Sequence, residues 1–225
     1  MAFRRKAARV VPETPRPAAA EASRLYLITP PLSSLGECPL LSEETAAACG
    51  VACLLVRTAA ASEEANEQIF RAVAAPLQTR GIACLVADDP QFCFRVNADG
   101  AHLTGPGPRL GEALRELKPN FIVGAGGLQT RHEAMIAAEA GADYVMFGEG
   151  GVPQPAIAGL VAWWAENITV PCVGFASGFE SISLLVSAGA DFIALGGTVF
   201  SDPRGVETAL REAASLLNPA LEERQ

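Results

Sequence analysis

The stretch that decides the fold is "AGADFIALGGTVFSDP", residues 188–203. It places a small residue and an aspartate ahead of a short apolar run, which ends on Gly196, Gly197 and Thr198. A buried strand that runs through glycines into a helix start is typical of a βα unit that holds an anion against its backbone. The segments "NADGAHL" (97–103) and "GADYVMFG" (141–148) repeat the first half of this pattern. The stretch therefore predicts one of several repeated βα units.

Outward from this stretch, strand-like apolar runs alternate with amphipathic runs. The amphipathic runs place their apolar residues on one helix face, as Ile69, Phe70, Val73 and Leu77 illustrate. Helices that bury one face on parallel strands, eight times in succession, predict a (β/α)8 TIM barrel. An open doubly wound sheet stays the alternative, because a strand count does not prove closure. The expected strands are 24–29, 51–56, 82–87, 99–103, 120–124, 143–148, 170–174 and 191–196.

The chain length fits one domain with a basic leader. We expect a single barrel over residues 24–217, a disordered Ala/Pro-rich leader over 1–23 and a short tail over 218–225. Net charge is −8, and residues 25–225 alone carry −12, because six of the 17 Lys and Arg fall in residues 1–24 beside two Glu. Such an acidic body repels a phosphate backbone, so we expect no nucleic-acid partner. No apolar run approaches the roughly 18 residues that cross a bilayer, so we expect no membrane partner.

The cysteines and lysines limit the cellular location and the kinds of catalysis that the sequence allows. The six cysteines contain no Cys-x-x-Cys pair, which predicts inert buried thiols and a reducing, cytoplasmic location. The chain has two lysines, Lys6 in the leader and Lys118 just before Pro119 at the expected bottom of the barrel. Because Schiff-base catalysis requires a lysine in the site, we exclude a lysine-dependent aldolase.

Ligand-binding residues are expected where the strands end, since active sites of this fold occupy the C-terminal rim. Loops after the seventh and eighth strands often hold a phosphate through free amides near a helix start. Glycine at these positions has no side chain that would block an anion from the backbone amides, although glycine can also be present only because it permits a tight turn. The predicted phosphate-binding residues are Ser177, Gly178, Gly196, Gly197 and Thr198.

Acid–base and metal candidates lie after the third, fourth and sixth strands. Asp88 can bind Mg²⁺ together with a substrate phosphate, but Asp88 and Asp89 also suit a helix cap before Pro90. His102 ends a strand, so it is either a general base at the mouth or a satisfied core residue, and Glu149 is a further candidate base. The structural residues are His132, expected on the solvent side of a helix, and Asp99, Asp143 and Asp191, expected at the N-terminal rim.

Four segments together resemble thiamine phosphate synthase and its thiazole tautomerase relatives over about residues 24–210. They are "GVACLLVRTAA", "GIACLVADDPQFCFRVNADGAHLTGPG", "AEAGADYVMFGEGG" and "VPCVGFASGFESISLLVSAGADFIALGGTVFSDP". The resemblance implies a barrel that joins a hydroxymethylpyrimidine diphosphate to a thiazole phosphate, with Mg²⁺ on the diphosphate. Arg57 matches the family's arginine, Asp88 a magnesium ligand and His102 the motif histidine. Its partners would be phosphorylated thiazole and pyrimidine small molecules, and a homo-oligomer is possible.

Several positions depart from the family pattern. The family's second magnesium aspartate falls on Gly107, its Thr-x-Thr-Lys loop reads "GEGGVPQPA" here, and an acidic Asp89 stands near the expected diphosphate. These changes leave three hypotheses open: a synthase with degraded motifs, an inactive barrel that binds or senses a thiazole or thiamine phosphate, and a phosphate-substrate isomerase. The isomerase would use Asp88, His102 or Glu149 as its base.

Overall fold

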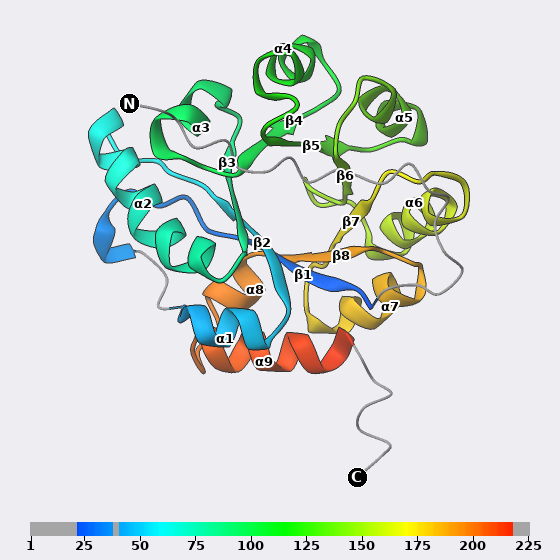
Figure 1. The fold of residues 1–225 in the computed structure, drawn as a ribbon. Coiled ribbons are helices and arrows are strands. Elements are labelled where there is room, and N and C mark those ends of the chain that lie inside the picture. The colour runs from blue at the N-terminus through cyan, green and yellow to red at the C-terminus, as the bar shows by residue number, and fades with distance from the viewer. Residues whose placement is uncertain (1–21, 38–40, 218–225) are drawn as a thin grey trace.

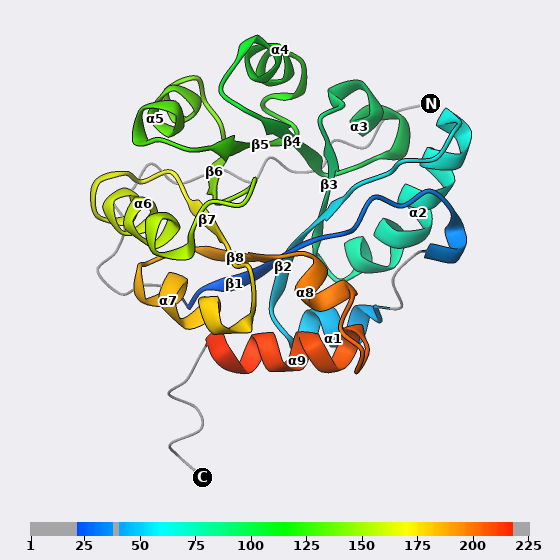
Figure 2. The ribbon, with the colours of Figure 1, turned by 180° about the vertical axis from the view of Figure 1, so that it is seen from behind.

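The strands of this chain close into a ring (Figure 1, and from behind in Figure 2). The computed structural model describes residues 22–37 and 41–217, so most of the predicted leader and the predicted tail lie outside the described residues. Each described strand pairs in parallel with the next along the chain, and the last pairs with the first. The strands are β1 (Arg24–Ile28), β2 (Val51–Val56), β3 (Ala83–Ala87), β4 (Gly100–Thr104), β5 (Ile122–Leu128), β6 (Tyr144–Phe147), β7 (Cys172–Phe175) and β8 (Phe192–Leu195).

Helices surround this ring on its outer side (Figure 1). Several begin at a side chain that accepts a backbone N–H, as Ser62 and Thr130 do at the starts of the second and fifth helices. The helices are α1 (Glu43–Ala48), α2 (Glu63–Thr79), α3 (Pro90–Val96), α4 (Pro108–Leu117), α5 (Arg131–Glu139), α6 (Gln154–Asn167), α7 (Ile182–Ser187), α8 (Gly197–Phe200) and α9 (Val206–Leu217), with short 3-10 turns η1 (Leu35–Glu37) and η2 (Phe179–Ser181). No described helix combines the length and apolar character that a membrane crossing needs.

The predicted (β/α)8 barrel is confirmed, and the open sheet is excluded by the pairing of β8 with β1. Leu25 lies beside Ile193 and Leu27 beside Leu195, which closes the ring. The strand positions agree with those expected to within a few residues, and β5 differs most. It continues through Gly126 and Gly127 to Leu128, where the sequence suggests a turn.

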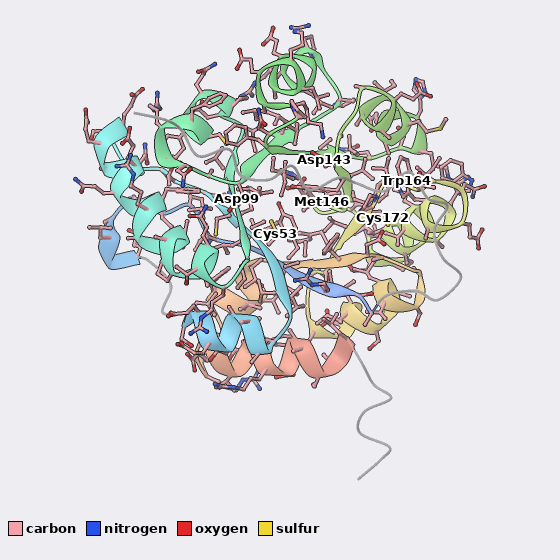
Figure 3. All side chains as sticks on the ribbon, in the orientation of Figure 1. Cys53, Asp99, Asp143, Met146, Trp164 and Cys172 are labelled. Carbon is pink, nitrogen blue, oxygen red and sulfur yellow. The ribbon has the colours of Figure 1, made fainter. Side chains whose placement is uncertain are left out.

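Two apolar layers hold the barrel together. An inner cluster fills the ring itself and includes Tyr26, Leu85 and Met146, while a larger outer cluster lies between strands and helices and includes Trp164. Figure 3 shows Met146 toward the middle of the ring and Trp164, a residue of α6, on its outer side. This arrangement makes the ring a packed core, so ligand chemistry is confined to the mouth.

Aspartates at the N-terminal rim tie neighbouring strands together, as predicted. In each of the three repeats the carboxylate accepts the backbone N–H at or next to the start of an adjacent strand, at 2.7 to 2.9 Å. The acceptor and donor pairs are Asp99 with Cys84, Asp143 with Val123 and Asp191 with Cys172. Asp143 also pairs with Lys118, which fixes that lysine far from the mouth.

Candidate active site

The two aspartates after β3 have different roles. Asp89 caps α3, because its Oδ1 accepts the Phe92 N–H at 3.0 Å and Pro90 occupies the first helical position. Asp88 has a left-handed backbone conformation with φ of 53°. Its Oδ1 accepts the Thr104 N–H at 2.8 Å and its Oδ2 accepts the Thr104 hydroxyl at 3.0 Å. Asp88 therefore joins the end of β3 to the end of β4.

These contacts bear on the Mg²⁺ that the family resemblance implies. Both oxygens of Asp88 are engaged by Thr104, and Gly107 offers no second carboxylate. Among the described residues no three His, Cys, Asp or Glu side chains come together as a group that could hold a metal ion. The donor set does not fit a Mg²⁺ site built from protein ligands, and Asp88 can supply one carboxylate at most.

A chain of hydrogen-bonded side chains runs from the barrel interior toward the mouth. The Tyr26 and Tyr144 hydroxyls lie 2.9 Å apart, and the Tyr144 hydroxyl lies 2.7 Å from Nδ1 of His102. His102 is 2% exposed, and its ring stacks on that of Tyr144. Sequence reasoning missed both tyrosines, although a phenol inside the otherwise apolar runs "RLYLIT" and "DYVMFG" is the signal that points to them.

Glu149 continues this chain at the mouth. Its Oε2 lies 3.4 Å from Nε2 of His102 and accepts the Gly127 N–H at 2.6 Å. The carboxylate fits there because Gly126 has no side chain: a Cβ at that position would lie 1.9 Å from Oε2 of Glu149 and 2.2 Å from Nε2 of His102. The unexpected extension of β5 through its glycines thus makes room for the His102–Glu149 pair, in which the histidine is buried and the glutamate partly buried.

Electrostatics keep Glu149 ionised. Burial opposes its ionisation, but the hydrogen bond and charge of His102, the Gly127 amide and the charge of Arg57 together lower its pKa below the ordinary value. Burial, with the neighbouring acidic groups, raises the pKa of both Tyr26 and Tyr144 well above the ordinary value. At neutral pH this row of hydrogen-bonded side chains, from Tyr26 to Glu149, therefore has neutral phenols in the barrel interior and a carboxylate at its outer end.

Arg57 follows β2 and reaches the same mouth. Its backbone is anchored by the loop after β1, where the Thr29 hydroxyl accepts the Arg57 N–H at 2.9 Å. Its guanidinium is exposed and makes no hydrogen bond or ion pair within the described part of the chain. A pocket of about 370 Å³ opens beside it, between α2 and α3. Residues lining this pocket include Pro31, Thr58, Asn66, Asp89 and Arg95.

The predicted phosphate-binding loops meet at the exits of β7 and β8. The Thr198 hydroxyl donates to the Ser177 carbonyl at 3.1 Å and so joins the two loops. At the β8 exit, Gly197 begins α8, and a Cβ built on it would meet nothing within 4 Å. At the β7 exit, a Cβ on Gly178 would lie 2.3 Å from a Glu180 carboxylate oxygen. The space beside Gly197 at the β8 exit is therefore open, whereas the Glu180 carboxylate lies against Gly178 at the β7 exit.

The closed strand order sets where these groups lie relative to one another. His102 and Glu149 meet on the β4–β5 side of the ring, opposite β8 and its glycines. Arg57 is at the end of β2, which lies between β8 and β4 in the order of strands around the ring. Asp88 directs its carboxylate to Thr104, and His132 is exposed on α5 as predicted. The structure therefore brings Arg57, His102 and Glu149 to one mouth.

Fold and site define a (β/α)8 barrel with a polar mouth at its C-terminal rim. The family model described as thiamine monophosphate synthase matches residues 25–199. The thiamine-phosphate synthase of Rhodospirillum centenum is 36% identical over 84% of this chain and 95% of the relative. That of Hyphomonas neptunium is 34% identical over 84% of this chain and 91% of the relative. The chain belongs to the thiamine monophosphate synthase family.

Solved structures agree on the fold. The thiamine phosphate pyrophosphorylase from Pyrococcus furiosus superposes with a TM-score of 0.73 at 22% identity, covering 88% of this chain and 96% of that chain. A 3-hexulose-6-phosphate synthase superposes with a TM-score of 0.63 at 16% identity, covering 85% of this chain and 99% of the other. At these identities the superpositions establish the architecture alone.

Proposed function

We propose that this protein acts in thiamine biosynthesis as a thiamine phosphate synthase that joins a hydroxymethylpyrimidine diphosphate to a thiazole phosphate. Family membership over residues 25–199 supports the substrate class. The observation that carries the proposal is Arg57, an exposed residue at the mouth whose guanidinium makes no hydrogen bond or ion pair with the described residues. Such a group is placed to bind an anionic leaving group. We further propose that the protein is located in the cytoplasm and that it forms a homo-oligomer.

In the proposed reaction, the bond between the pyrimidine methylene carbon and the diphosphate oxygen breaks, and the thiazole nitrogen attacks the resulting cation. Arg57 would stabilise the charge that develops on the departing diphosphate, which is the main catalytic contribution expected of such a site. The amides of Gly197 and Thr198 would hold the thiazole phosphate at the open β8 exit. In this proposal Mg²⁺ would bind together with the diphosphate, and it takes no part in the steps described above.

The test is a coupling assay with purified protein, both substrates and Mg²⁺, in which thiamine phosphate is detected by mass spectrometry. We expect product above the background without enzyme. The Arg57→Ala variant should lose about a hundredfold in kcat/KM, because a cation facing the leaving group is removed. Arg115→Ala is the matched control, since Arg115 is exposed near the end of α4 and far from the mouth. A wild-type protein without product, or an R57A variant as fast as the wild type, would contradict the proposal.

A second candidate is a barrel that binds a thiazole or thiamine phosphate without turnover. Glu149 favours it, because a carboxylate held by His102 and Gly127 lies beside the mouth where the family pattern has a cationic loop. This candidate predicts measurable binding of thiamine phosphate in calorimetry together with no product in the coupling assay. Failure to bind any phosphorylated thiazole, pyrimidine or thiamine would exclude it.

A further inference from the structure

The Glu149 carboxylate lies over the barrel interior at its C-terminal end. Side chains of β5 face inward at alternate positions, and Ile122 packs against the inner apolar cluster. Two residues on, a Cβ at Gly124 would lie 1.9 Å from the Tyr144 ring. After two more, a Cβ at Gly126 would lie 1.9 Å from Oε2 of Glu149. The carboxylate therefore takes the next inward place above Tyr144, where a ligand bound in the mouth meets the top of the core.

Hydrogen bonds from behind hold this carboxylate in one position. Because an ionised carboxylate only accepts, a neutral His102 carries its proton on Nε2, 3.4 Å from Oε2 of Glu149. Nδ1 then accepts the Tyr144 hydroxyl at 2.7 Å, and the Tyr144 oxygen accepts the Tyr26 hydroxyl at 2.9 Å. The Gly127 N–H is a second donor to Oε2, at 2.6 Å. Every donor in this row points toward Glu149, so its negative charge is fixed before a ligand binds.

The second oxygen of the carboxylate is left for a ligand. Oε1 of Glu149 makes no hydrogen bond with the described residues, and they do not bury it completely. The side chain as a whole is 26% exposed. A charge that is partly shielded from water acts more strongly on a neighbouring charge than one in open solvent. Glu149 thus presents a fixed negative potential at the mouth, which suits a group that becomes positive.

We propose that Glu149 is a catalytic residue of the synthase reaction and that its carboxylate stabilises the pyrimidine methylene cation. The inference rests on the proposed function and deepens it. When the C–O bond breaks, its electron pair leaves with the diphosphate, and the thiazole nitrogen then donates its lone pair to the methylene carbon. The nitrogen becomes the permanent cation of the product. Glu149 forms no bond and transfers no proton.

This role raises kcat rather than affinity for the substrate. The pyrimidine ring of the bound substrate is uncharged, so the carboxylate attracts it weakly, whereas the attraction is strong once the carbon becomes positive. An interaction that is stronger in the transition state than in the ground state accelerates the reaction. Arg57 acts on the departing diphosphate, and Glu149 acts on the carbon that the diphosphate leaves.

Steady-state kinetics of the full chain in the coupling assay tests the role. Glu149→Gln keeps an oxygen that accepts from His102 and Gly127 and removes the charge. We expect kcat to fall about a hundredfold, while KM for the pyrimidine diphosphate changes by less than about threefold. Glu139→Gln is the matched control, because Glu139 is exposed at the far end of α5 and the net charge changes equally. This control should keep the wild-type kcat and KM.

Calorimetric titration separates the charge of Glu149 from its packing. Thiamine phosphate has a cationic thiazole ring, whereas the thiazole phosphate has an uncharged one. Relative to the wild type, E149Q should bind thiamine phosphate about tenfold less tightly and the thiazole phosphate within about threefold. A loss of packing alone would weaken both ligands alike.

The outcomes distinguish this inference from the proposed function. If the wild type forms product and E149Q has the same kcat, or if E139Q is slowed as much as E149Q, the inference is overturned and the proposed function stands. Equal losses of affinity for both ligands in E149Q would also overturn the inference. A wild type without product would contradict the proposed function and, with it, the catalytic role of Glu149.

Discussion

Gly126 controls the geometry of the mouth at the scale of single residues. A side chain there would meet both members of the His102–Glu149 pair, the nearer contact being 1.9 Å from its Cβ. Both partners are held from behind, His102 by Tyr144 and Glu149 by Gly127, so neither can retreat without losing a hydrogen bond. Glycine at this position is therefore required by the pair itself.

Substituting Gly126→Ala should separate His102 from Glu149. We expect the free energy of unfolding to fall by about 1–3 kcal/mol, the usual cost of overpacking, in chemical denaturation. Gly111→Ala is the control, since Gly111 lies in the middle of α4, where an added Cβ would meet nothing within 4 Å, and alanine there should stabilise the helix by up to about 1 kcal/mol. A G126A variant as stable as the wild type would show that the pair is not packed as described.

The positions of the residues at the mouth could be predicted from the sequence more reliably than their roles. Arg57 and Asp88 directly follow strands and His102 lies within β4, and the apolar runs place these strands reliably. The bond of Asp88 to Thr104 depends on a left-handed backbone at Asp88 and on the pairing of β3 with β4. Neither property is encoded in a local pattern. The sequence alone therefore could not decide whether Asp88 binds a metal ion or has a structural role.

At the scale of elements, the three rim aspartates explain why the βα repeat is visible in the sequence. Each carboxylate accepts the N–H at or beside the start of a neighbouring strand, so it joins two βα units. Asn97, Gly141 and Gly189 have positive φ values shortly before these aspartates and turn the chain toward the next strand. This local chemistry repeats, and it was therefore predictable from short segments.

Asp99→Ala should remove one of these links. Asp99 also accepts the Gln78 side-chain amide at 2.8 Å, so the variant leaves two donors without this acceptor. We expect the free energy of unfolding to fall by about 2 kcal/mol in urea denaturation. Glu112→Ala, a change at an exposed position of α4, should stay within about 0.5 kcal/mol of the wild type. Equal stability of the two variants would refute a structural role for Asp99.

The fifth strand shows where element prediction failed. A run of Gly-Ala-Gly-Gly is typical of a turn, and the expected strand stopped at residue 124. In the structure Gly124 pairs with His102 and Tyr144, and Gly126 pairs with Thr104, so the segment continues the sheet. The glycines are required by side chains from β4 and from the loop after β6, and such long-range contacts leave no local signal.

For the whole molecule, the two tyrosines give a direct measure of barrel integrity. The chain contains two tyrosines, Tyr26 and Tyr144, and both lie in the ring interior. Their pKa values are raised well above the ordinary value, chiefly by burial, so the folded state keeps its phenolic protons where the unfolded state loses them. Stability from this source is fully present below about pH 10 and is lost as pH rises above that value.

Alkaline titration should therefore show tyrosinate absorbance only as the barrel unfolds. We expect the absorbance at about 295 nm and the loss of far-ultraviolet circular dichroism to share one transition above about pH 10. Titration of either phenol near its ordinary pKa while the circular dichroism stays native would contradict the buried Tyr26–Tyr144 pair.

A crystal structure with thiamine phosphate tests the central claim, that the mouth holds a phosphorylated ligand between the β8 exit and the His102–Glu149 pair. The account predicts the phosphate within hydrogen-bond distance of the Gly197 and Thr198 amides, with the rest of the ligand inside the barrel mouth. A phosphate bound instead in the pocket between α2 and α3, or away from the barrel mouth, would contradict it.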